Sequence, residues 1–131
     1  MFRWFSKKAA PLSGAPAVRR QKTYSAQSGY VYQYFYEGHR PMAAPRGTEY
    51  VFNVSPDRKS SSQVSVFVTD EVMLSWQQES GRTLSATEQY AIAKMALFQA
   101  FDERETPEAM RMAVHVGPGD VRAILASLNI D

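Results

Sequence analysis

Alternation of apolar and polar positions predicts three β-strands in the first half of the chain, at residues 29–37, 48–55 and 62–70. The last two are joined by a short polar turn with the sequence PDRKSS, which is typical of an antiparallel hairpin. Residues 38–47 contain two prolines and two glycines, and this composition predicts a loop between the first two strands. A connection of that length is long for a hairpin, so the loop is a candidate functional segment.

Helical patterns follow in the second half of the chain. Asp70 is predicted to cap a helix that stops at Gly81. Ser85 and Glu88 have the spacing of a capping box, which predicts that a second helix begins there and runs to about residue 102. This helix is apolar on most sides, so we expect it to dominate the core. After a Gly-Pro-Gly break, Asp120 is predicted to cap a last helix with one apolar stripe.

This order of elements predicts an α+β fold: a three- or four-stranded antiparallel sheet with two or three helices packed on one face. Residues 111–116 fit both a helix and a fourth strand, and a helix end followed by extended chain is the preferred interpretation. Residues 1–28 carry prolines and small residues between cations, which predicts an extended basic tail. A single compact domain is predicted over residues 29–131, a length that can bury one hydrophobic core.

Charge is unevenly distributed, although the net charge is only +2. Six cations and no acid precede Glu37, whereas nine cations and thirteen acids occur from Glu37 onward. The acidic body is therefore not predicted to bind nucleic acid, while the tail could contact nucleic acid or an anionic membrane surface. No apolar run approaches the roughly 20 residues of a transmembrane helix, and prolines in the tail argue against a signal peptide. The predicted location is cytoplasmic, or the mitochondrial matrix if the tail is a presequence.

Four tyrosines share one face of the first predicted strand, and three interpretations are open. The rings could belong to the core beneath the second predicted helix, form a protein interface, or stack nucleic-acid bases. Base stacking is disfavoured, because no cation lies among the rings and the nearest charge is Glu37. The opposite face is weakly apolar, so we expect one face to meet a second chain or the tail. The four residues are Tyr30, Tyr32, Tyr34 and Tyr36.

The first eight residues, MFRWFSKK, combine aromatic and basic side chains. This composition suits the headgroup layer of an anionic membrane or an acidic protein surface. A group of acids at the end of the second predicted helix is a candidate docking region, within one chain or between chains: Asp102, Glu103, Glu105 and Glu108. The tail residues predicted to bind a partner are Phe2, Arg3, Trp4, Phe5, Lys7 and Lys8.

Residues suited to catalysis are scarce. The chain has no cysteine and only two histidines, so we predict no catalytic residue, no metal site and no cofactor. The adjacent His39 and Arg40, in the predicted loop, are the one pair that could bind a ligand. The leading hypothesis is a non-enzymatic protein-binding or assembly module that self-associates or docks a protein through the tyrosine strand and the tail. The alternative is a small ligand-binding protein or enzyme with a pocket between sheet and helices near residues 38–47.

Overall fold

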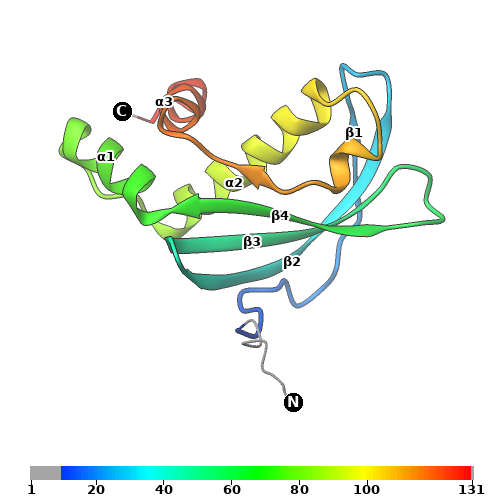
Figure 1. Ribbon diagram of the computed structural model, residues 1–131, viewed down its shortest axis with the longest axis horizontal. Helices are drawn as coiled ribbons and strands as arrows, with labels where there is room; N and C mark the ends of the chain where they lie inside the picture. Colours follow the sequence, from blue (N-terminus) through cyan, green and yellow to red (C-terminus); the bar gives the residue numbers. More distant parts are fainter. Residues whose placement is uncertain (1–9, 131) are drawn as a thin grey trace, which may run out of the picture.

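Five strands form one curled sheet in the computed structural model, which describes residues 10–130, and helices cover one of its faces (Figure 1). The α+β class predicted from the sequence is therefore confirmed. The strands are β1 (Lys22–Ser25), β2 (Val31–Ala43), β3 (Arg46–Ser55), β4 (Ser62–Thr69) and β5 (Val114–His115). The helices are α1 (Asp70–Ser80), α2 (Ala86–Glu103) and α3 (Pro118–Ser127), with a 3-10 turn at Ala109–Arg111.

Neighbouring strands follow the order of the chain, β1-β2-β3-β4-β5. The first four pair antiparallel, and the hairpin predicted between residues 48–55 and 62–70 is confirmed as β3–β4. The short β5 pairs parallel to β4 after the 3-10 turn. Residues 111–116 are thus the end of a helical turn followed by extended chain, in agreement with the preferred interpretation.

The prediction of a loop at residues 38–47 is wrong. β2 continues to Ala43 and β3 begins at Arg46, so the connection between them is short. Glycine and proline punctuation suggested a loop, but Pro41 lies on the part of β2 that extends beyond β1. A proline is tolerated there, because that edge of the strand has no continuous neighbour that needs its missing N–H group.

A β-bulge at Glu37 changes which side chains of β2 face the helices. Tyr36 pairs with Phe52 and Gly38 pairs with the adjacent Val51, so Glu37 is the extra residue in the ladder. Before the bulge, even-numbered positions share the helix-facing side; after it, odd-numbered positions do. His39, paired with Tyr50, therefore joins the tyrosines on the helix-facing side.

Helix boundaries agree with the capping signals to within a few residues. The Ser85–Glu88 capping box is present at the start of α2, and Gly81 ends α1 in the left-handed conformation. Two predicted caps are wrong. Thr69, not Asp70, caps α1, because its hydroxyl accepts from the Val72 amide at 3.3 Å. Asp120 is the third residue of α3, and its carboxylate accepts from the amide of the capping Gly117.

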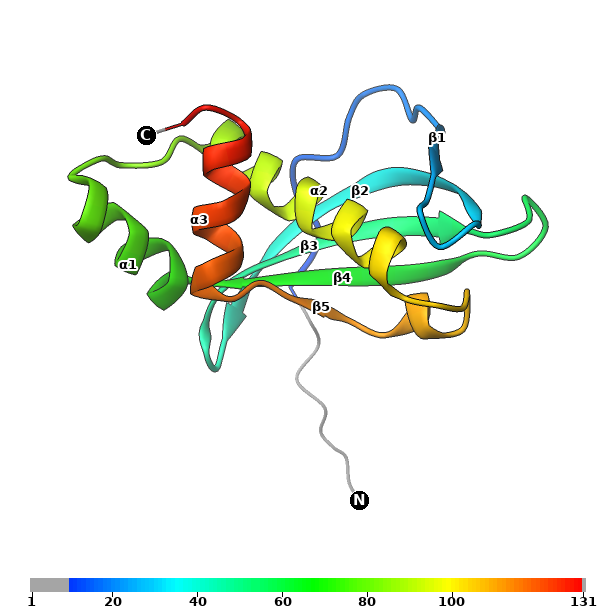
Figure 2. The same ribbon diagram turned by 90° about the horizontal axis from the view of Figure 1, so that it is seen from above.

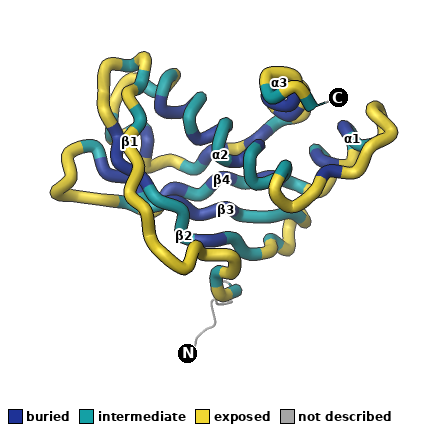
Figure 3. Tube along the Cα trace, turned by 180° about the vertical axis from the view of Figure 1, so that it is seen from behind, coloured by how far each residue is buried: buried dark blue, intermediate teal, exposed yellow. Residues whose placement is uncertain are grey.

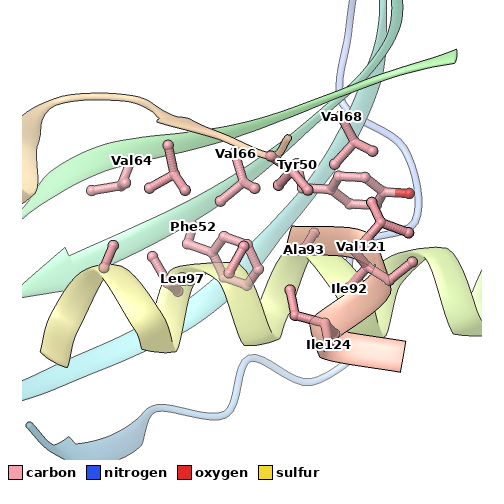
Figure 4. Close-up of a cluster of buried hydrophobic side chains, with 14 of the residues drawn as sticks. Tyr50, Phe52, Val64, Val66, Val68, Ile92, Ala93, Leu97, Val121 and Ile124 are labelled. Carbon is pink, nitrogen blue, oxygen red and sulfur yellow. The ribbon is translucent and has the colours of Figure 1, made fainter. Parts of the chain in front are cut away.

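The core lies between the sheet and α2, as Figure 2 shows from above. Figure 4 shows Leu97 and Ala93 of α2 directed toward the apolar side chains of β3 and β4. Phe52, Val64 and Val66 are fully buried there. Each such side chain contributes roughly 1.5–3 kcal/mol by leaving water. The helix predicted over residues 85–102 was expected to dominate the core, and its buried face contributes to the core as α2.

β1 lies within residues 1–28, so part of the predicted tail belongs to the sheet. Tyr24 of β1 stacks on Phe98 of α2 at 4.5 Å between ring centroids, and its hydroxyl donates to Asp102 at 2.8 Å. The Gln27 amide donates to the same carboxylate at 2.9 Å. These contacts close the sheet around the end of α2. Residues 10–21, here called the strap, precede β1 and are largely exposed (Figure 3).

Candidate functional site

One row of side chains on α2 packs against β1, β2 and β3. Tyr90, Lys94 and Phe98 follow one another at four-residue spacing, so they lie on the same side of the helix. Tyr90 meets the rings of β2 and β3, whereas Phe98 meets those of β1 and β2. Lys94, between the two aromatic contacts, is half-buried.

Tyr32 and Tyr34 lie in the core beneath α2. Tyr32 is fully buried and stacks on Phe101 at 4.6 Å, and Tyr34 is packed edge-on against Phe98. Their rings are therefore not available on the surface of a single chain. Tyr30, at the start of the strand, is 38% exposed. The four tyrosines share one face as predicted, but the fold divides them between core, pocket and surface.

A pocket of about 520 Å³ lies where the strap, β2, β3 and the start of α2 meet. Aromatic rings form much of its wall, together with small and polar residues of the strap and α2. The lining residues are Gly14, Pro16, Tyr36, His39, Thr48, Tyr50, Ala86, Thr87, Gln89 and Tyr90. Its volume falls within the range of roughly 300–1,000 Å³ that is usual for small-molecule sites. We call it the tyrosine pocket.

The rings of the tyrosine pocket are tilted against one another. Tyr36 and Tyr90 lie 4.7 Å apart with an interplanar angle of 56°, and Tyr50 lies 6.4 Å from Tyr90. The Tyr36 hydroxyl and the His39 Nδ1 are hydrogen-bonded at 3.0 Å. That bond orients the imidazole, which can donate or accept according to its tautomer. The pocket therefore offers flat apolar surfaces with polar groups at their edges.

The strap holds His39 in place from the edge of β2. Ser13 and His39 exchange two backbone hydrogen bonds of 2.8 Å, and Figure 2 shows the strap following this side of the sheet. Gly14 lies directly against the imidazole, since a Cβ built on it would be 2.7 Å from the His39 Cε1 atom. The strap is thus one wall of the tyrosine pocket.

Arg40 is not in the pocket. It follows His39 on β2, so it lies on the outer face of the sheet, where its Nε donates to Glu49 Oε1 at 2.9 Å. This ion pair and a hydrogen bond from Ser65 hold the pKa of Glu49 below its usual value. The structure therefore separates the predicted His39–Arg40 pair between two faces of the sheet, because adjacent residues of a strand point in opposite directions.

Burial raises the pKa of most tyrosines in this region, and desolvation is the largest cause for each. The affected residues are Tyr24, Tyr32, Tyr34, Tyr36, Tyr50 and Tyr90. Their ionisation requires taking a buried phenol to a charged form, which the low-dielectric surroundings disfavour.

We expect this shift to cause alkaline unfolding. A tyrosine whose folded-state pKa is above the unfolded value of 10.0 contributes stability that is fully present below pH 10 and is lost as the pH rises further. Tyrosinate absorbance and circular dichroism should therefore change together above pH 10. Complete ionisation of the tyrosines while the near-ultraviolet spectrum stays native would contradict this expectation.

The described residues contain neither a metal-binding cluster nor a membrane-spanning helix. Within residues 10–130, no group of three or more His, Asp or Glu side chains is placed to hold a metal ion. The same part of the chain contains no helix of the length and apolarity needed to span a bilayer. His115, the second histidine, is on β5, where it stacks on Phe67 at 5.3 Å between ring centroids.

Two aromatic residues of the tyrosine pocket, Tyr50 and Tyr90, were not among the site residues predicted from the sequence. Tyr50 falls in the strand predicted at residues 48–55 and Tyr90 in the helix predicted from Ser85 to about residue 102, and both elements are present as β3 and α2. Tyr50 pairs with His39 in the β2–β3 ladder, and the packing of α2 on the sheet brings Tyr90 to the same pocket. The four-residue spacing of Tyr90, Lys94 and Phe98 was a usable signal for their common face.

The predicted tail contacts lie partly outside the description of the structure. Phe2, Arg3, Trp4, Phe5, Lys7 and Lys8 all fall outside residues 10–130. Among the acids proposed as their docking region, Asp102 already binds Tyr24 and Gln27 of the same chain.

Comparisons of this chain with protein-family models, with curated proteins and with solved structures find no match. The residues of the tyrosine pocket are therefore the basis for a functional proposal.

Proposed function

We propose that this protein binds a small organic molecule in the tyrosine pocket. The observation that carries the proposal is the convergence of Tyr36, Tyr50 and Tyr90 around His39 in a pocket of about 520 Å³. These residues come from β2, β3 and α2, elements that are held by the core, so the rings are positioned before any ligand arrives. This proposal corresponds to the alternative hypothesis from the sequence, except that Arg40 does not line the pocket.

The chemistry of the wall indicates the kind of ligand. Tilted aromatic rings bind a flat apolar body by offset and edge-on contacts. The phenol hydroxyls, the His39 imidazole and the Gln89 amide can then donate to and accept from polar groups on its rim. We therefore expect a ring-bearing molecule with hydrogen-bonding substituents.

Titration with 2-naphthol, a neutral flat ring with one hydroxyl, tests the proposal. We expect the backbone amide NMR signals of Thr87 and Gln89 to shift on binding. Tyr90→Ala should weaken binding by about tenfold, because one stacked ring is worth roughly 0.5–1.5 kcal/mol beyond its buried area. Tyr30→Ala removes the same side chain outside the pocket and serves as the matched control. Equal affinity of Tyr90→Ala and the wild type would contradict the proposal.

A second candidate function, association with a protein or a second copy, is supported by an exposed part of the face of the sheet that no helix covers. Helices pack on only one face (Figure 1), and on the other face Val31, the first residue of β2, is 44% exposed. We expect light scattering at increasing concentration to show a rise in mass that Val31→Lys reduces. A constant monomer mass at all concentrations would contradict self-association through this surface.

A further inference from the structure

A second, smaller pocket adjoins the tyrosine pocket. It has a volume of about 250 Å³ and shares Pro16, Tyr36 and Tyr90 with its neighbour. The two pockets are therefore neighbours that share part of their walls, between α2 and the edge of the sheet. The remaining lining residues are Val18, Arg20, Lys22, Tyr34, Phe35 and Lys94. We call it the cationic pocket.

Three cations from three segments meet in the cationic pocket. Lys22 pairs with Tyr34 in the β1–β2 ladder, so its side chain leaves the helix-facing side of the sheet. Arg20 lies two residues earlier in the strap and lines the same pocket. Lys94 comes from the opposite wall, on α2, one turn beyond Tyr90.

No carboxylate compensates these charges among the described residues. None lines the cationic pocket, and within residues 10–130 none of the three cations forms an ion pair. Glu37, on the nearby strand, is already held by Arg19 at 2.7 Å and by Gln63 at 3.1 Å, on the other face of the sheet. Burial lowers the pKa of Lys94, and the charge and close approach of Lys22 lower it further. Like charges so placed oppose folding unless an anion joins them.

We propose that Arg20, Lys22 and Lys94 bind the phosphate group of a ligand whose ring lies in the tyrosine pocket. The proposal rests on the proposed function, because the anion site adjoins the tyrosine pocket and shares Tyr36 and Tyr90 with it. Three cations match a doubly charged phosphate better than a singly charged carboxylate. Tyr34, although largely buried, forms part of the wall of the cationic pocket.

A matched pair of probes tests the anion site separately from the ring site. 2-Naphthyl phosphate and 2-naphthol differ only in the phosphate group. We expect the phosphate ester to bind about tenfold more tightly, as charge-assisted hydrogen bonds allow, and this advantage should shrink as salt is added. Lys94→Gln should remove most of the advantage and leave the affinity for 2-naphthol unchanged.

Lys59→Gln is the control for charge alone. Lys59 lies in the exposed turn between β3 and β4 and does not line the cationic pocket. Its replacement by glutamine changes the net charge by the same amount as Lys94→Gln. Inorganic phosphate, compared with potassium chloride at equal ionic strength, should shift the amide signals of Lys22 and Lys94 in the wild type. It should not shift them in Lys22→Gln/Lys94→Gln, a variant that relieves repulsion and is therefore expected to fold.

The outcomes separate the two proposals. If 2-naphthol binds and its phosphate ester binds no more tightly, the phosphate site is overturned and the tyrosine pocket stands. If inorganic phosphate binds at Lys22 and Lys94 but 2-naphthol does not bind, the anion site stands without the ring site, and their coupling is overturned. Equal losses in Lys59→Gln and Lys94→Gln would indicate unspecific attraction and overturn the phosphate site, and binding of no probe would overturn both proposals.

Discussion

Replacing Phe101 by alanine is expected to lower the free energy of unfolding by about 3–5 kcal/mol. Phe101 is fully buried, stacks on Tyr32 at 4.6 Å, and lies 5.5 Å from Tyr24 between ring centroids. Its ring therefore joins α2 to both β1 and β2. A loss of that size is a large fraction of the roughly 5–15 kcal/mol that stabilises a typical domain. Urea unfolding followed by circular dichroism measures it.

Phe67→Ala is the matched control, since it removes the same atoms from the outer face of the sheet. Phe67 is half-buried and contacts His115 without a helix above it. Its replacement should cost clearly less, because less apolar surface leaves water at that position. Equal losses for the two variants would show that the contact between α2 and the β1–β2 edge is not the centre of stability.

Replacing Gly38 by alanine is expected to detach the strap and to destabilise the fold by about 1–3 kcal/mol. Gly38 has φ = 130°, which side chains rarely adopt. A Cβ at this position would also lie 2.6 Å from the Ser13 carbonyl oxygen and 3.1 Å from the Leu12 Cβ. Hydrogen exchange of the Ser13 and His39 amides, which bond across this contact, should accelerate.

Gly29→Ala separates backbone strain from the contact with the strap. Gly29 has φ = 98°, but a Cβ there would meet nothing within 4 Å. It should therefore lose stability through strain alone, with the Ser13 and His39 amides as protected as in the wild type. If Gly38→Ala costs no more than Gly29→Ala and leaves these amides protected, the strap does not depend on the glycine.

The elements that could be predicted from the sequence are those whose signals are local. The Ser85–Glu88 capping box, the Gly81 stop and the β3–β4 hairpin each depend on residues a few positions apart. The extension of β2 through Pro41 could not be predicted in this way. It depends on which part of the β2 edge has no neighbouring strand, and that is decided by where β1 begins, at Lys22 opposite Tyr34. The same limit hid β1 inside the predicted tail.

The candidate site was predictable only in part. The tyrosine alternation correctly indicated one common face, and His39 was identified as a candidate ligand residue. In an extended strand, His39 and Arg40 point to opposite faces of the sheet. Because a loop was predicted there, this separation was not expected. The cationic pocket joins residues that are more than seventy positions apart in the chain. No spacing rule connects Lys22 to Lys94, because their meeting depends on how the sheet curls around α2.

The single extra residue at Glu37 also decides how relatives of this chain should be recognised. It shifts the alternation of β2, so the pocket histidine is the third residue after Tyr36, whereas in a regular strand the second residue would face the same side. A related chain without the bulge would turn the residue at position 40 toward the helices and the residue at position 39 toward the outer face. An alignment that places a gap a few residues away would therefore exchange the pocket residue with the ion-pair residue. Alignments with relatives should therefore allow one extra residue between the positions of Tyr36 and His39.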